Sequence, residues 1–198
     1  MYDFGFYLEH SVCFQAFLTE RLPIQPINNI GDFNLILDEF KKTCKRQLTD
    51  IIDNNNHIVA FGIRFDKVCD IKLDSANSLL QYDKLGDHMY FDKATKNATA
   101  GMEGGTYIWR FGDEYRYVGE TKNLKKRVSL YSNITKKLVD DDDRRTNRRV
   151  NAEICKTINE DRKSVTLYFY PTQNHHHDIE QYLLQFKSKS VFNLNEKV

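Results

Sequence analysis

The residues best suited to chemistry lie between Gly105 and Tyr131, in the run GTYIWRFGDEYRYVGETKNLKKRVSLY. Two short aromatic segments carry Tyr107 and Tyr117, and a lysine-rich segment carries Arg127 and Tyr131. Arginine offers a planar fork of donors that suits phosphate. A tyrosine, whose ordinary pKa is about 10, needs a nearby cation before its phenolate forms near neutral pH. This combination indicates a site that handles phosphate esters.

A hairpin and a helix are predicted to position these residues. Thr106–Arg110 and Tyr115–Val118 are predicted to pair around a turn at Gly112-Asp113. The segment Lys122–Ser132 is predicted as a helix with Thr121 as its N-cap. Because residues four apart on a helix share a face, Arg127 and Tyr131 would lie together.

The rest of the C-terminal half is predicted to complete a small α/β domain, residues 101–198. A mixed acidic and basic stretch, Leu138–Arg149, leads into a predicted helix whose apolar stripe runs over Val150–Ile158. A strand is then predicted at Val165–Tyr170 and a last helix at His176–Lys187. We therefore predict a three-stranded, mostly antiparallel sheet flanked by helices.

Residues 1–100 are predicted as an α+β accessory region. Helical spacing favours helices over 6–21 and 32–50, and a turn is predicted at Asn54-Asn55-Asn56. The runs HIVAFGIRF and KVCDIKL are predicted as two strands joined around Asp66-Lys67, and Lys93–Gly104 as a linker. This region would read DNA, form a homodimer or bind a partner protein.

Charge and composition set further limits. Residues 1–100 hold 11 Lys+Arg against 14 Asp+Glu, and residues 101–198 hold 18 against 14, so the basic excess lies beside the Gly105–Tyr131 stretch. The four cysteines show no zinc-site spacing and are interpreted as free thiols. Neither a secretion signal nor a membrane-spanning apolar run is visible. We expect a cytoplasmic protein with no membrane contact.

Three short motifs carry a family resemblance. The GIY-YIG endonuclease family is resembled at Gly105-Thr106-Tyr107, at Tyr117-Val118-Gly119, and at Asn123-Leu124 with Arg127. The run Tyr117–Tyr131 is especially similar to the nuclease domain of the bacterial excision-repair incision subunit. The resemblance covers residues 104–195 and implies hydrolysis of DNA phosphodiester bonds with one Mg²⁺ or Mn²⁺ per site.

The resemblance also implies the roles of individual residues. The catalytic set would be Tyr107, Tyr117, Arg127, Tyr131 and Glu180, with Glu180 as the metal ligand. One carboxylate is sufficient, because Mg²⁺ keeps several waters and takes further oxygens from the substrate. Substrate contacts would come from Gly119, Lys122, Asn123, Lys126, Arg148 and Asn193.

Three points leave alternatives open. The repair members carry a lysine where this chain has Glu120, so either Lys122 supplies that cation or the base is organised differently. Asn195 competes with Asn193 for the family's late asparagine. The run His175–His177 is interpreted as a polar loop or phosphate contact rather than a metal site, although His177 and Glu180 are three residues apart.

These observations predict a metal-dependent DNA endonuclease of restriction, phage or mobile-element type. The alternatives are a structure-specific DNA-repair nickase and a catalytically idle nucleic-acid-binding module. Since one such site cuts one strand, double-strand cleavage would need a dimer or successive nicks.

Overall fold

The structure, a computed structural model, describes residues 51–73, 91–132, 145–172 and 174–195. The chain divides into two compact units, Met1–Asp66 and Lys67–Val198. The helices predicted over 6–21 and 32–50 lie outside the described residues.

The first described strands are β1 (Ile51–Asn54), β2 (His57–Ala60) and β3 (Ile63–Asp70), paired antiparallel in that order. The turn predicted at the asparagine run is confirmed between β1 and β2. The turn predicted at Asp66-Lys67 is wrong, because β3 runs through these two residues. The chain turns instead at Phe61-Gly62, whose φ angles of 51° and 87° suit a two-residue hairpin turn.

The three remaining strands are β4 (Gly105–Phe111), β5 (Glu114–Thr121) and β6 (Val165–Pro171). The sheet has six strands in the order β1-β2-β3-β6-β4-β5, and β4 pairs antiparallel with both β5 and β6. The mixed α/β class is confirmed. The predicted three-stranded sheet is too small, because β3 adds to it beside β6.

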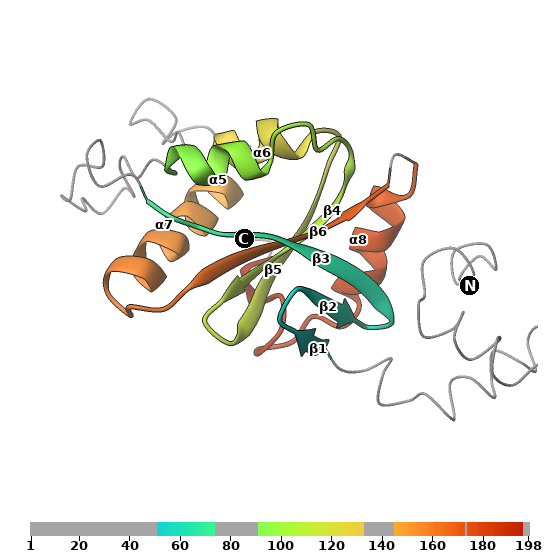
Figure 1. Cartoon of the computed structure of the whole chain (residues 1–198). Helices are drawn as coiled ribbons and strands as arrows, with labels where there is room; N and C mark the ends of the chain where they lie inside the picture. Colours follow the sequence, from blue (N-terminus) through green and yellow to red (C-terminus); the bar gives the residue numbers. More distant parts are fainter. Residues whose placement is uncertain (1–50, 74–90, 133–144, 173, 196–198) are drawn as a thin grey trace, which may run out of the picture. The chain divides into compact units, whose positions relative to one another are not determined.

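The described helices are α5 (Lys93–Ala98), α6 (Leu124–Ser132), α7 (Arg145–Asn159) and α8 (His176–Leu184), followed by the 3₁₀ turn η3 (Asn193–Asn195). Helix α5 corrects the prediction of a linker. Asp92 caps it by accepting a hydrogen bond from the Thr95 N–H at 2.7 Å, and Thr95 and Thr99 are buried. Figure 1 shows α5, α6 and α7 gathered together and α8 apart from them.

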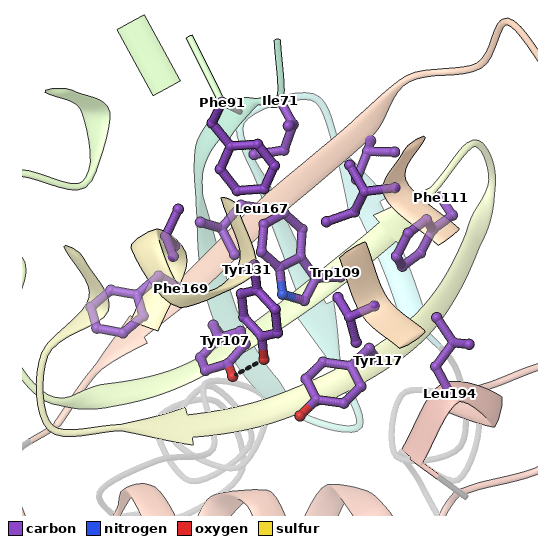
Figure 2. Close-up of a cluster of buried hydrophobic side chains, with 14 of the residues drawn as sticks. Ile71, Phe91, Tyr107, Trp109, Phe111, Tyr117, Tyr131, Leu167, Phe169 and Leu194 are labelled. Atoms are coloured by element: carbon purple, nitrogen blue, oxygen red, sulfur yellow. Dashed lines mark hydrogen bonds between the residues drawn. The ribbon is translucent and has the colours of Figure 1, made fainter. Parts of the chain in front are cut away.

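Side chains of β4 alternate between two layers. Tyr107, Trp109 and Phe111 belong to one buried cluster with apolar residues of α6 and α7 (Figure 2). Thr106 faces the other way, and its hydroxyl donates a hydrogen bond to the His176 carbonyl of α8 at 2.9 Å. Groups from α6 and α8 therefore approach the sheet from opposite faces.

Cys69 and Cys155, the cysteines of the described segments, are free thiols. Burial raises the pKa of Cys155 to about 12 and that of Cys69 to about 11, where nearby Asp70 and Asp92 add to the effect. Within the described segments, every helix is too short or too polar to span a membrane.

Candidate active site

Three tyrosines meet where β4, β5 and α6 pack together. The rings of Tyr107, Tyr117 and Tyr131 lie 6.2 to 6.4 Å apart between centroids. The hydroxyl oxygens of Tyr107 and Tyr131 are 2.6 Å apart and share a hydrogen bond, drawn as a dashed line in Figure 2. The structure thus brings together the three tyrosines singled out in the sequence.

Gly119 makes room for this group of tyrosines. It lies opposite Tyr107 in the register of β4 and β5. A Cβ atom at Gly119 would come within 2.6 Å of Tyr107 Cζ and 3.0 Å of Tyr117 Cε1. The glycine is required by the close approach of these rings, and its role here is to shape the site.

The tyrosines are held in their neutral form in the free protein. Burial raises the pKa of Tyr107 and Tyr131 well above the ordinary value, and it also raises the pKa of Tyr117. Arg127 acts in the opposite direction and lowers the pKa of all three. A phenolate would therefore need more positive charge nearby than Arg127 alone provides.

Arg127 lies on α6, near the tyrosines and near Glu180 of α8. Its Nη2 donates a long hydrogen bond of 3.5 Å to the Glu120 carbonyl, and the side chain is half-buried. Burial acts to lower its pKa, but the three tyrosines and Glu180 outweigh burial and raise the pKa overall. The guanidinium is thus firmly charged and close enough to these groups to influence them.

The N-cap of α6 is Asn123, not the predicted Thr121. The Asn123 Oδ1 accepts a hydrogen bond from the Lys126 N–H at 2.8 Å, and the Thr121 hydroxyl accepts one from the Asn123 N–H at 3.1 Å. These bonds fix the start of the helix that carries Arg127.

Glu180 approaches from α8. Burial is the largest influence on its carboxyl group, and with the nearby Glu120 carboxylate it raises the Glu180 pKa to about 7. His177, Arg127 and a hydrogen bond from the Glu120 backbone lower the pKa in part. The predicted metal ligand therefore lies in the same site as Arg127.

Glu120 is a site residue that sequence reasoning missed. It forms a group with Glu180 and His177. Each of the three residues contributes one possible ligand atom, a carboxylate oxygen or a ring nitrogen, and these atoms all lie within 4.8 Å of one another. Glu120 also lies 3.6 Å from His176 Nε2. Strand alternation was the available signal, because Gly119 faces the tyrosines and the next residue must face α8.

A pocket of about 330 Å³ adjoins this group, lined by Glu103, Gly104, Lys122, Asn123 and His176. Two of the predicted substrate contacts, Lys122 and Asn123, are therefore found in one pocket. A third, Lys126, is exposed on α6.

Asn193, another predicted contact, bonds to other parts of the domain. Asn193 accepts a hydrogen bond from Arg116 Nε at 3.0 Å and donates one to the Lys189 carbonyl at 3.1 Å. Asn195 instead bonds both backbone groups of Val118, at 2.9 and 2.6 Å, and so holds β5 directly. Arg148 belongs to α7, but its side chain is outside the described part.

Comparisons of the chain with protein-family models, curated proteins and solved structures find no match. Function is therefore argued from the motifs and from the geometry of the site.

Proposed function

We propose that this chain is a metal-dependent DNA endonuclease that hydrolyses phosphodiester bonds at the site formed by Tyr107, Tyr117, Arg127, Tyr131 and Glu180. The observation that carries the proposal is the position of Arg127. It is near enough to three tyrosines and to Glu180 for all four to shift its pKa. A charged fork of donors near hydroxyl groups and a carboxylate suits a phosphodiester and an attacking water.

Each side chain then has a distinct task. Arg127 would bind the phosphoryl oxygens, whose negative charge increases in the transition state. One of the three tyrosines would orient the water, and because burial raises the pKa of each, it would accept a proton only while positive charge is close. Lys122 in the neighbouring pocket would contact a flanking phosphate.

Glu180 would hold Mg²⁺ or Mn²⁺. The donor set fits such an ion, because hard divalent cations prefer carboxylate oxygens and two carboxylates converge here. When bound, the ion would neutralise charge on the phosphoryl group and on the leaving oxygen.

The GIY-YIG likeness supports an enzyme of restriction, phage or mobile-element type. A structure-specific repair nickase is the alternative within the same chemistry. An idle nucleic-acid-binding module is less well supported, because all five proposed catalytic positions carry residues that are competent for the chemistry. One site would cut one strand, so double-strand cleavage would need a homodimer or successive nicks. Residues 1–100 would contact DNA, a second copy of the chain or a partner protein.

Nicking of supercoiled plasmid tests the proposal. The protein should convert supercoiled to open-circular DNA with Mg²⁺ or Mn²⁺ and should stop on addition of EDTA. Glu180→Gln keeps the size of the side chain but removes its charge, and it should lower the nicking rate at least a hundredfold. DNA binding without any metal-dependent nicking would refute the enzyme and support the binding module.

A further inference from the structure

Two side chains beside Glu180 are suited to metal binding and do not belong to the catalytic set proposed above. Glu120 comes from the end of β5, and His177 comes from the first turn of α8. His177 Nδ1 lies 3.4 Å from Glu120 Oε1, and Glu180 completes a group whose ligand atoms lie within 4.8 Å of one another.

These distances suit a single ion. With metal–ligand bonds of about 2.1 to 2.2 Å, neighbouring ligand atoms of an octahedral ion are about 3 Å apart and opposite ones about 4.4 Å apart. The separation of 3.4 Å between His177 and Glu120 is close to the first value, and no separation in the group is larger than 4.8 Å. Small side-chain movements would close the group around an ion.

Two carboxylates converge at this point, and one of their oxygens is incompletely paired. Glu120 Oε2 is buried without a hydrogen-bond donor within the part of the chain that the structure describes. The carboxylates of Glu120 and Glu180 repel each other, and a cation bound between them would relieve this repulsion. A ring nitrogen of His177 can offer an electron pair to the same point.

We propose that Glu120 and His177 bind the divalent ion together with Glu180, as a three-ligand site that prefers a first-row transition ion such as Mn²⁺ over Mg²⁺. Imidazole nitrogen is a common ligand of transition ions, whereas Mg²⁺ binds through oxygen and keeps most of its water. The proposal rests on the proposed function only for the role of the ion in cleavage. The ion binding itself is independent of DNA.

Mn²⁺ binding to the full chain without DNA tests the site, with the loss of the free-Mn²⁺ electron paramagnetic resonance signal as the readout. Wild type should bind one Mn²⁺ per chain. His177→Ala and Glu120→Gln should each weaken binding at least tenfold, and Glu180→Gln should weaken it further. Asp178→Asn is the matched control, because this exposed carboxylate lies next to His177 in sequence and outside the group. It should change binding less than twofold.

Two further readouts separate ligation from an effect on folding. Bound Mn²⁺ should show a ¹⁴N coupling from the His177 ring that is absent in His177→Ala and retained in Asp178→Asn. Mg²⁺ should displace Mn²⁺ only at concentrations at least tenfold higher.

Several results would overturn the proposal. The first is that wild type binds no stoichiometric Mn²⁺, and the second is that His177→Ala and Glu120→Gln bind Mn²⁺ as tightly as wild type. The others are that bound Mn²⁺ shows no nitrogen coupling, or that Mg²⁺ displaces Mn²⁺ at an equal concentration. Mn²⁺ binding as described, combined with no nicking of plasmid, would refute the proposed function and leave the metal site standing.

Discussion

The hydroxyl groups of Tyr107 and Tyr131 share a buried hydrogen bond 2.6 Å long. The bond joins β4 to α6 across 24 residues, and neither side chain is exposed. Asn151 of α7 also donates a hydrogen bond to the Tyr131 carbonyl. These bonds hold the helix that carries Arg127 against the sheet, so the stability of the fold and the geometry of the site depend on the same contacts.

The first prediction concerns this pair of tyrosines. Tyr131→Phe leaves the Tyr107 hydroxyl buried without its partner and should reduce the free energy of unfolding by about 1–3 kcal/mol. Tyr107→Phe should cost a similar amount. The double variant should lose clearly less than the sum, because both polar groups are then removed. Urea unfolding measures all three, and strict additivity would show that the bond contributes nothing.

A second prediction concerns the space that Gly119 leaves for the tyrosine rings. In Gly119→Ala the new methyl group would clash with Tyr107 and Tyr117, so the rings must move at a cost of about 1–3 kcal/mol. Plasmid nicking should fall at least tenfold as the hydroxyl groups are displaced. Gly104→Ala is the control for stability, because its Cβ would approach other atoms no closer than 3.4 Å. Equal stability of the two variants would contradict the packing described here.

The fold could be predicted where the pattern is local. The β4–β5 hairpin and the helices α6, α7 and α8 follow from turn residues and apolar spacing. Helix α5 was missed because its buried residues are threonines rather than aliphatic side chains. The extent of the sheet was missed because the position of β3 beside β6 depends on contacts between segments nearly 100 residues apart, about which local periodicity says nothing.

The site, like the fold, could be predicted only where the signal lies in a local stretch of sequence. Motif spacing was enough to select the three tyrosines, Arg127 and Glu180. Glu120 was noted only as a departure from the family pattern, since its meaning depends on which helix lies over that face of β5. The choice between Asn193 and Asn195 depended on the direction of each side chain in η3, and Asn195 is the residue that bonds β5.

A third prediction concerns alkaline pH. The pKa values of Tyr107, Tyr117 and Tyr131 are raised in the folded protein, whereas those of unfolded tyrosines are about 10. Above pH 10 the unfolded chain therefore holds fewer protons than the folded one. The contribution of these tyrosines to the free energy of unfolding is therefore fully present below pH 10. It is lost as the pH rises toward the pKa values that the tyrosines have in the folded protein. Each such tyrosine steepens the loss by up to about 1.4 kcal/mol per pH unit.

Urea unfolding between pH 9 and 11.5 measures this dependence. Tyr131→Phe should lose stability less steeply than wild type above pH 10. Tyr170→Phe removes a tyrosine that is only partly buried and serves as the control. An equally steep loss in Tyr131→Phe and wild type would contradict the burial of the Tyr131 hydroxyl in the folded state.

The fourth prediction concerns two cationic residues of α6. Arg127 lies among the tyrosines and Glu180, whereas Lys125 is exposed two residues earlier on the same helix. Removing a donor that stabilises charge in the transition state costs about 10²- to 10³-fold in rate. Removing one exposed cation weakens contact with DNA phosphates only modestly at moderate salt.

The initial rate of supercoiled-plasmid nicking with Mn²⁺, measured at saturating protein for wild type, Arg127→Ala and Lys125→Ala, tests the central claim most directly. Both variants should first be shown to be folded by circular dichroism and urea unfolding. We predict metal-dependent nicking by wild type, a rate at least a hundredfold lower for Arg127→Ala, and a rate within threefold of wild type for Lys125→Ala. Nicking by Arg127→Ala at the wild-type rate, or none by wild type, would contradict a phosphodiesterase site built around Arg127.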